Sequence, residues 1–349
     1  MRISRVILPI ILGVVVVIYL LWGQFDAEEF SKIEWSRTAW IWLLAAVMFL
    51  VIRHLAYSAR LRILSQGGFS WRKCIELIFI WEFSSAVSPT SVGGSAVALF
   101  VLSHEKLSTA KTTAIVLYTV VLDTLFFISS IPIYYLVFGP AIIRPGLTSF
   151  STMDGWAMTF LIAYIFMTLY GAFFFYALFL RPDKGRIFLH WIGSLKIFRR
   201  WRWRIIRLGA GFVQASRELR RREFSFHLKA FLSTVVAWSM RFLLINCLII
   251  AIVNVIQPDF FSQFKLFARL QTMFVVLAFS PTPGGAGFHE LVFGDFLRDY
   301  IPAGIAVVVA AIWRLLTYYS YLIAGAFVIP NWIRSVLKRR SRQKQATIA

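Results

Sequence analysis

Two stretches, SPTSVGG at residues 88–94 and SPTPGG at residues 280–285, decide how this chain folds. Each places a proline and paired glycines inside a long apolar segment. Proline removes a backbone donor and glycine releases the backbone from helical geometry, so each segment should open or turn back on itself. Broken segments at matching places in two halves of a chain are typical of transporters built from internal repeats. The repeated stretch therefore predicts two re-entrant helical hairpins.

The overall composition is that of a membrane protein. The chain has 349 residues, of which 59% are hydrophobic and 15% charged, and its formal net charge is +21. A soluble protein of this length cannot bury so much apolar surface. The basic residues lie between and after the apolar segments, where anionic lipid head groups are the natural partners, so no nucleic-acid binding is expected. The composition predicts an all-α multi-pass membrane protein.

Hydropathy and loop charge predict about six full membrane spans in addition to the two hairpins. The spans are expected at residues 6–22, 39–58, 112–138, 156–180, 227–256 and 303–329. Basic loops and the basic tail are cytoplasmic by the positive-inside rule, so both termini are expected in the cytoplasm of a bacterial-type plasma membrane. The first hairpin, residues 74–103, then enters from the cytoplasm and the second, residues 266–302, enters from outside, with a short outer loop before it at residues 257–265.

The predicted spans divide the single membrane domain into two halves of opposite orientation. The parts are an N-terminal anchor with an outer loop (1–38), a first half (39–138), a connecting span with a basic stretch (139–226), a second half (227–330) and a basic cytoplasmic tail (331–349). Each half runs span, hairpin, span. This order predicts an inverted-topology repeat.

Ionisable residues inside the predicted spans mark a candidate site, because a charge at the bilayer centre costs about 2.5–3.5 kcal/mol unless it pairs or lines a polar cavity. The candidate substrate-binding residues are Arg241, Arg314, Arg53, Tyr318, Asp123 and Glu82. The acids do not obviously balance the arginines, and a surplus cation invites an anionic ligand. Arginine suits phosphate through its planar fork of donors. Tyr318 and Tyr321 are expected to share a helical face with Arg314, and Asp123 to orient an arginine or a cationic group. The alternative is that Asp123 and Glu82 pair with arginines for structural reasons.

The hairpin tips supply the other polar candidates. They are Ser88, Pro89, Thr90, Gly93 and Gly94 in the first copy and Ser280, Pro281, Thr282, Pro283, Gly284, Gly285 and Glu290 in the second. The two serines lack a His or Asp companion at a comparable position, so we expect capping rather than nucleophilic chemistry. The His-Glu pairs at 104–105 and 289–290 lack HExxH spacing, so no metal or other cofactor is expected.

The basic stretch at residues 199–222 has apolar residues at helical spacing. They are Trp201, Ile205, Leu208, Phe212 and Leu219, with arginines on the other faces. This pattern predicts a helix lying on anionic lipids of the inner leaflet. A solvated helix that links the two halves is the alternative.

These residues resemble the flippase-like membrane domain of lysylphosphatidylglycerol synthase over nearly the whole chain. The resemblance rests on residues 85–102, on residues 116–127 with their aspartate, on PTPGGAGFHE at residues 281–290, and on Trp313-Arg314. The chain departs from the first motif, since many relatives carry Pro-x-Arg-x-Gly-Glu where this chain has PTSVGG. The departure removes an Arg and a Glu from the first hairpin.

The resemblance implies movement of an anionic phospholipid or lipid-linked molecule between leaflets, with the paired hairpins as gates. No enzyme activity is expected, because the aminoacyl transfer of the two-part synthase belongs to a soluble domain that we do not find here. A membrane-embedded enzyme, or a membrane subunit of one, acting on a lipid phosphate or an aminoacyl-lipid is the alternative. A third interpretation is an assembly partner that docks a cytoplasmic or membrane enzyme.

Overall fold

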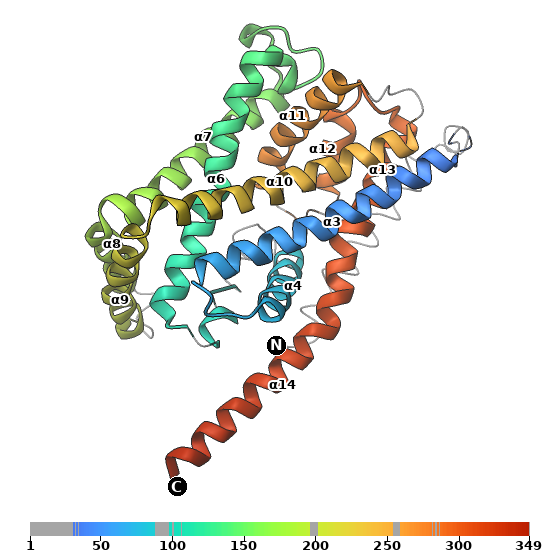
Figure 1. The fold of residues 1–349 in the computed structure, drawn as a ribbon. Coiled ribbons are helices and arrows are strands. Elements are labelled where there is room, and N and C mark those ends of the chain that lie inside the picture. Colours follow the sequence, from blue (N-terminus) through green and yellow to red (C-terminus); the bar gives the residue numbers. More distant parts are fainter. Residues whose placement is uncertain are drawn as a thin grey trace.

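The computed structural model describes residues 31, 33, 35–87, 98–99, 101–105, 107–195, 202–253, 259–280, 282, 285 and 287–348. Throughout these ranges every regular element is a helix and there is no strand (Figure 1). The main helices are α3 (Arg37–Leu64), α4 (Trp71–Val87), α6 (Thr109–Phe138), α7 (Gly155–Phe175), α8 (Pro182–Ser194), α9 (Arg202–Arg220), α10 (Phe224–Ile252), α11 (Phe260–Leu277), α12 (Phe288–Phe296), α13 (Ala303–Arg314) and α14 (Ser320–Ile348). The all-α prediction is confirmed for the described part of the chain.

Five continuous helical segments are long and apolar enough to cross a membrane. They are Arg37–Leu64, Thr109–Ile142, Gly155–Leu180, Phe224–Ile252 and Ile305–Val336. These segments coincide with five of the six predicted spans. The remaining prediction, residues 6–22, lies outside the described residues, so the count of six stays a prediction.

Local sequence sets where several of these helices begin. The hydroxyl of Ser36 accepts a hydrogen bond from the backbone N–H of Ala39 at the start of α3, and Ser108 does the same for α6. Such caps satisfy backbone donors that the first turn of a helix leaves without partners. These two spans therefore begin where a small polar residue precedes an apolar run.

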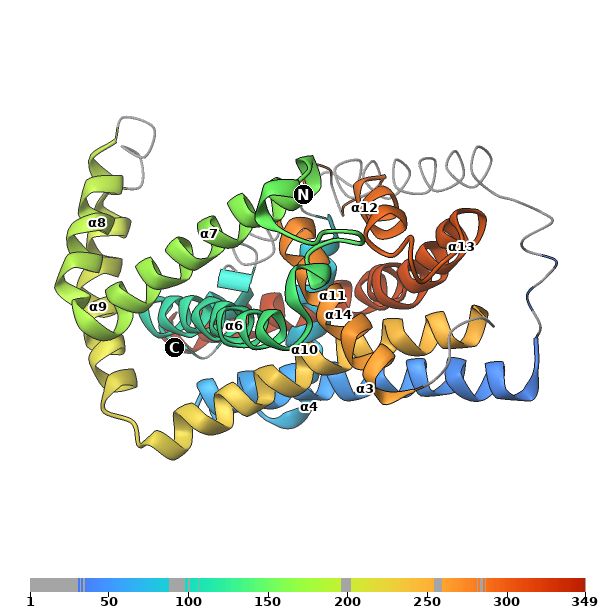
Figure 2. The same cartoon turned by 90° about the horizontal axis from the view of Figure 1, so that it is seen from above.

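The two long helices α3 and α10 lie side by side and run in opposite directions (Figure 1, Figure 2). α3 is the first span of the predicted first half and α10 is the first span of the second. Their opposite directions are what an inverted-topology repeat requires. The arrangement also places the intramembrane arginines of both helices next to one cavity.

Helix α4 packs between α3 and α14, and α11 packs against α6, α7 and α10. Close approach of α14 to α4 depends on Gly325, where an added Cβ would lie 2.3 Å from the ring of Phe83. The first helix of each predicted hairpin therefore contacts the last span of the opposite half.

The second proline-glycine stretch interrupts its helix as predicted. α11 ends at Leu277 and α12 begins at Phe288, and Gly285 and Gly287 between them have φ of 71° and 76°. These left-handed conformations favour glycine, which has no Cβ. α12 has 9 residues, too few to cross a bilayer. The first stretch lies within residues 88–97, outside the described part of the chain, and the return of each hairpin within a membrane stays a prediction.

Several boundaries differ from those predicted. α3 continues to Leu64 instead of ending at residue 58, and α11 begins at Phe260, within the stretch predicted as a loop at residues 257–265. The tail continues α14 as one helix to Ile348, and Figure 1 shows this helix extending away from the bundle. Hydropathy alone ends a span where polar residues begin, although a helix can continue beyond the apolar core.

Two ion pairs of Arg144 join the segment between α6 and α7 to α12. Arg144 forms ion pairs with Asp154, which caps α7, and with Asp295 on α12. Slight burial acts to raise the pKa of Asp154, but hydrogen bonds from the Ala157 N–H and from Arg144 outweigh it and hold this pKa below its usual range. These ion pairs hold the first turn of α7 against α12.

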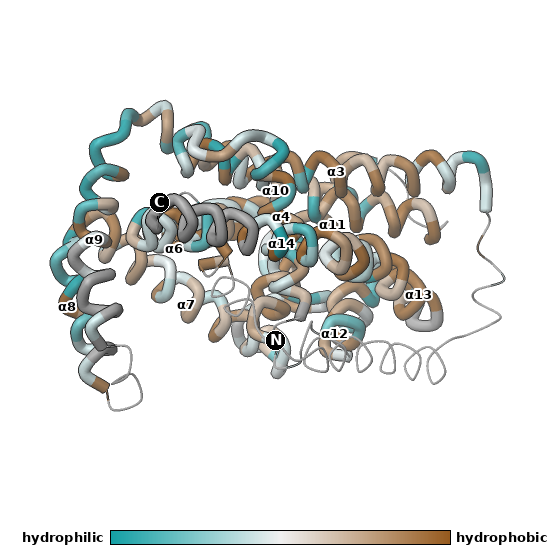
Figure 3. Tube along the Cα trace, turned by 90° about the horizontal axis from the view of Figure 1, so that it is seen from below, coloured by the Kyte–Doolittle hydropathy of each residue, from teal (hydrophilic) through white to brown (hydrophobic). Residues whose placement is uncertain are grey.

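Helices α8 and α9 pack together at one end of the molecule and carry many hydrophilic residues (Figure 2, Figure 3). Phe212 and Leu219, which the sequence predicts on a lipid-facing stripe, are buried against the rest of the protein. Trp191 and Trp203 are exposed instead, at 59% and 72%. The side chains of Trp201, Ile205 and Leu208 lie outside the described ones, so the prediction is wrong for Phe212 and Leu219 and stays a prediction for the other three.

Candidate substrate cavity

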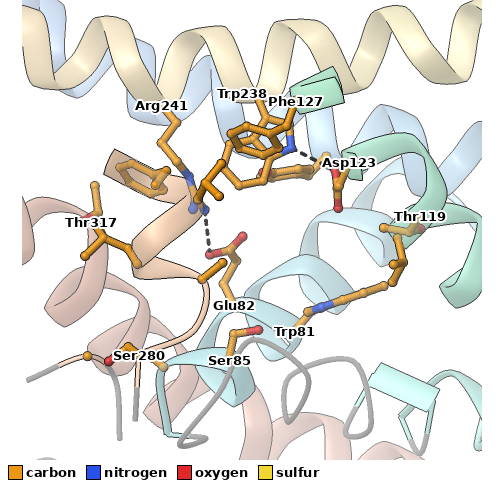
Figure 4. A pocket seen from close by; sticks show the side chains of 18 of the residues that line it. Trp81, Glu82, Ser85, Thr119, Asp123, Phe127, Trp238, Arg241, Ser280 and Thr317 are labelled. Carbon is orange, nitrogen blue, oxygen red and sulfur yellow. Dashed lines mark hydrogen bonds and ion pairs between the residues drawn. The ribbon is translucent and has the colours of Figure 1, made fainter. Parts of the chain in front are cut away.

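A cavity of about 430 Å³ lies between α3, α4, α6, α7, α10, the end of α11 and the start of the last span. Its lining includes all six predicted substrate-binding residues, namely Arg53, Glu82, Asp123, Arg241, Arg314 and Tyr318. Figure 4 shows Glu82 rising from α4 toward Arg241 on α10, with Asp123 beside Trp238. Charged residues that are distant in the sequence thus meet in one chamber, whose lining also holds many apolar side chains.

Arg53 and Glu82 form the most fully bonded ion pair in the cavity. Arg53, whose side chain is 1% exposed, donates from Nη2 to both carboxylate oxygens of Glu82 at 2.8 Å. Its Nη1 donates to the hydroxyl of Tyr321 at 3.2 Å, and that hydroxyl also lies 3.1 Å from Nδ1 of His54. A buried cation held by several charge-assisted bonds is a rigid part of the site.

Arg241 is differently placed. Its nearest carboxylate oxygen belongs to Glu82, at 3.9 Å from Nη2, which is an ion-pair distance but longer than a hydrogen bond. The guanidinium lies over the rings of Trp238 and Phe274, at 4.7 and 5.5 Å from their centroids. These aromatic faces hold the cation through cation–π attraction and leave its N–H donors directed at the cavity. Among the described residues, Arg241 shares an acid that is already engaged by Arg53.

Asp123 is held by an arginine, as the sequence predicts, but by Arg60 rather than one of the predicted candidates. Its Oδ1 accepts from Arg60 Nη1 at 2.5 Å and from Trp238 Nε1 at 2.9 Å. Arg60 also donates to the hydroxyl of Thr234 at 3.2 Å. The other carboxylate oxygen of Asp123 has no hydrogen bond from the described residues, and the side chain is 28% exposed on the cavity side.

Arg314 and Glu290 form a deeply buried pair. Arg314 Nη1 donates to Glu290 Oε1 at 2.9 Å, and both side chains are 2% exposed. The guanidinium also lies 4.5 Å from the ring centroid of Tyr318. The chain after Arg314 forms a π-helical turn, η6 (Leu315–Tyr319), a feature frequent at functional sites. Arg314 thus reaches the cavity wall as part of an ion pair whose acid comes from the second broken segment.

The charges around the cavity do not balance. The described arginines of the lining are Arg53, Arg60, Arg241 and Arg314, and their carboxylate partners are Glu82, Asp123 and Glu290. Four guanidinium groups therefore face three carboxylates. The surplus lies at Arg241, since each of the other three has an acid within hydrogen-bond distance.

The second broken segment supplies polar groups to the same chamber. Ser280, Thr282 and Gly285 line the cavity, and the hydroxyls of Ser280 and Thr282 lie 3.2 Å apart. His289 follows on α12 and stacks on Trp313. Pro281, Pro283 and Gly284, and all five predicted tip residues of the first copy, lie outside the described residues. No group of three His, Cys, Asp or Glu side chains suited to a metal occurs in the described ranges.

Two further buried arginines are absent from the predicted site residues. Arg60 follows the predicted span 39–58, yet it is 7% exposed and lines the cavity. Arg269, on α11, is fully buried and donates to both carboxylate oxygens of Asp299, at 3.0 and 3.3 Å. A lone arginine in an apolar run was the available signal for Arg269. Its pair lies away from the cavity and ties α11 to the segment before α13.

Comparison with known proteins agrees with this architecture. The model of the family "Lysylphosphatidylglycerol synthase TM region" matches residues 6–325. A UPF0104 membrane protein of Archaeoglobus fulgidus is 26% identical over 336 residues, which cover 91% of this chain and 94% of that protein. No solved structure matches the chain. With five apolar helical segments and a family match across nearly its full length, this multi-pass membrane protein belongs to the family of the lysylphosphatidylglycerol synthase TM region.

Proposed function

We propose that the protein is a flippase-like transporter that moves an anionic phospholipid or lipid-linked molecule between membrane leaflets. The observation that carries the proposal is Arg241, a cavity-lining cation that shares its nearest carboxylate with Arg53. A phosphate on a lipid head group would give its guanidinium the bidentate partner that the described protein groups do not. Ser280 and Thr282 would add hydroxyl donors to the same anion.

Asp123 would receive the other end of the head group. Its second carboxylate oxygen is available for a hydroxyl or ammonium donor, while Arg60 and Trp238 fix the first. Arg314 would act with Arg241 on the phosphate, chiefly through its positive potential, because its guanidinium is also bonded to Glu290. A head group with a phosphate and a separate hydrogen-bond donor suits this pair of polar sites.

In this proposal the cavity lies between inverted halves and is reached laterally from one leaflet, with the broken segments as gates. Both termini are cytoplasmic in a bacterial-type plasma membrane, and the basic stretch at residues 199–222 faces anionic inner-leaflet lipids. The protein changes the sidedness of a lipid without changing its mass, so we do not propose an enzyme. A separate enzyme partner that makes or uses the lipid is compatible with this role.

Replacing Arg241 with glutamine should slow lipid exchange by about 10- to 100-fold, because a lost charge-assisted hydrogen bond is worth about 1.5–3 kcal/mol. The assay uses purified protein in proteoliposomes with a fluorescent phosphatidylglycerol whose outer-leaflet fraction is bleached chemically. Lys229→Gln is the matched control, since Lys229 is an exposed cation on the same helix and lies outside the cavity lining. Mass spectra of the lipid before and after incubation should be identical.

If wild type, Arg241→Gln and Arg314→Ala exchanged every tested phospholipid at equal rates, the proposed binding site would be contradicted. A new lipid product that depends on Ser280, His289 or Glu290 would favour the membrane-embedded enzyme instead.

A further inference from the structure

The cavity wall between α7 and the end of α11 is shared by the polar chamber and the outer surface. Phe166 on α7 is 56% exposed and Phe279, two residues beyond α11, is 42% exposed, yet both side chains line the cavity. Their rings meet edge to face with centroids 5.4 Å apart. At this place the wall includes side chains that touch the cavity on one side and the surroundings of the protein on the other.

The outside of this wall is suited to hydrocarbon. α7 belongs to an apolar segment, residues 155–180, without any Asp, Glu, Lys or Arg. Ile162, Ile165 and Leu169 on the same helix are 61%, 49% and 64% exposed. A contiguous apolar face on a membrane-spanning helix is solvated by lipid chains.

The inside of the wall leads directly to polar groups. Ser280 follows Phe279 in the chain and lines the cavity, and Thr282 does so two residues later. The helix ends at Leu277, and the N–H of Phe279 bonds to the carbonyl of Val276 in a final tight turn at 3.2 Å. A polar and an apolar side chain are thus adjacent at the point where the backbone changes direction.

We propose that the contact between Phe166 and Phe279 is an acyl-chain portal, a site where the chains of a phospholipid cross from the cavity to the bilayer while its phosphate lies near Arg241. This inference rests on the proposed function and names the ligand class of the wall, which is a fatty acyl chain. A charged head group gains from the donors of Arg241, whereas an acyl chain in the same place would cover that cation without offering it an acceptor. The aromatic pair separates the two environments and must part when a lipid passes.

Cross-linking the portal should stop exchange reversibly. The variant Phe166→Cys/Phe279→Cys is treated with a short bis-methanethiosulfonate reagent that dithiothreitol reverses, and lipid exchange is measured in proteoliposomes. The native Cys74 and Cys247 are both buried. We expect exchange to fall at least about tenfold on cross-linking, as for a locked lid, and to return on reduction.

The structure offers a closely matched control pair. Phe173 and Phe188 also meet edge to face, with centroids 5.1 Å apart, and they are 40% and 39% exposed but do not line the cavity. Phe173→Cys/Phe188→Cys, cross-linked with the same reagent, should retain its exchange rate. Equal inhibition of both pairs would overturn the portal.

A single-cysteine experiment covers the case in which the double variant fails to fold or to cross-link. Phe279→Cys labelled with a bulky pyrene maleimide should lose exchange, and labelled Phe173→Cys should keep it. Full exchange by labelled Phe279→Cys would overturn the portal and leave the proposed function intact. Absence of exchange by the unmodified wild type, with every phospholipid tested, would remove the proposed function and the portal together.

Discussion

Replacing Glu290 with leucine should lower the free energy of unfolding by about 3–5 kcal/mol, because it leaves the guanidinium of Arg314 buried without its acid. The two side chains are each 2% exposed and are joined by a 2.9 Å hydrogen bond. Arg314→Leu should cost a similar amount, since Glu290 would then be the uncompensated charge. The measurement is reversible unfolding of the purified protein in mixed detergent micelles.

The double variant Glu290→Leu/Arg314→Leu distinguishes the effect of losing the ion pair from the effect of leaving one charge without its partner. Removing both charges should cost much less than the sum of the single changes, because no unpaired charge remains in the core. The exposed pair of Arg217 and Asp183, 3.7 Å apart and about 60% exposed, is the control. Arg217→Leu should change stability by less than about 1 kcal/mol. Additive effects at Glu290 and Arg314 would contradict the buried ion pair.

The second large effect is expected at Glu82, the acid shared by two arginines. Glu82→Gln should destabilise the protein by about 3–5 kcal/mol, because Arg53 is buried and donates to both of its oxygens. The same change leaves Arg53 and Arg241 as adjacent cations without their common carboxylate. An anionic ligand should therefore stabilise this variant more than it stabilises wild type.

Thermal unfolding with and without phosphatidylglycerol in the micelles tests this expectation. The lipid should raise the Tm of Glu82→Gln more than that of wild type, since a ligand stabilises the state in which its site is built. Glu76→Gln is the control on the same helix, because Glu76 pairs with Lys73 outside the cavity. Equal shifts for all three proteins would show that the lipid does not compensate for the lost carboxylate.

Charge inside apolar segments predicted several of the charged residues that line the cavity. Arg53, Asp123, Arg241 and Arg314 stand out because few ionisable residues occur within the predicted spans, and all four line the same chamber. The free energy needed to place a charge inside the bilayer explains this agreement, because such a charge persists where a polar environment surrounds it. Their role in binding a substrate stays a prediction.

The pairing of these charges could not be predicted from the sequence. Glu82 bonds to Arg53 and Glu290 to Arg314 through packing between different helices. Arg60 was missed because the predicted span ended at residue 58, whereas α3 continues to Leu64 and turns Arg60 toward Asp123. Hydropathy reports where apolar residues stop and not which way the next basic residue points.

Tyr321 does not lie on the helical face that ideal α-helical spacing predicts, because the backbone departs from α-helical geometry before it. Ideal α-helical spacing predicts Tyr321 on the face of Arg314, but the π-helical turn η6 lies between them. A π turn changes the hydrogen-bond register and therefore rotates the residues that follow it. Tyr321 contacts Arg53 and His54 instead, while Tyr318 stays with Arg314.

The second helix break was predictable as an interruption but not in its geometry, and the first lies outside the described residues. Proline and glycine at residues 280–285 place the end of α11 and the turn before α12 correctly. His289 at the start of α12 stacks on Trp313, a contact that the sequence does not specify. The inverted relation of the two halves agrees with the antiparallel α3 and α10, and passage of a hairpin within the membrane stays a prediction.

The central claim is that Arg241 draws a phosphate-bearing lipid into the cavity, and native mass spectrometry of the purified protein tests it most directly. Wild type and Lys229→Gln should each retain a lipid whose fragments include a phosphate, and Arg241→Gln should lose most of it because the surplus cation is gone. Equal retention of that lipid by wild type and Arg241→Gln, or no retained phosphate-bearing lipid in wild type, would contradict the account.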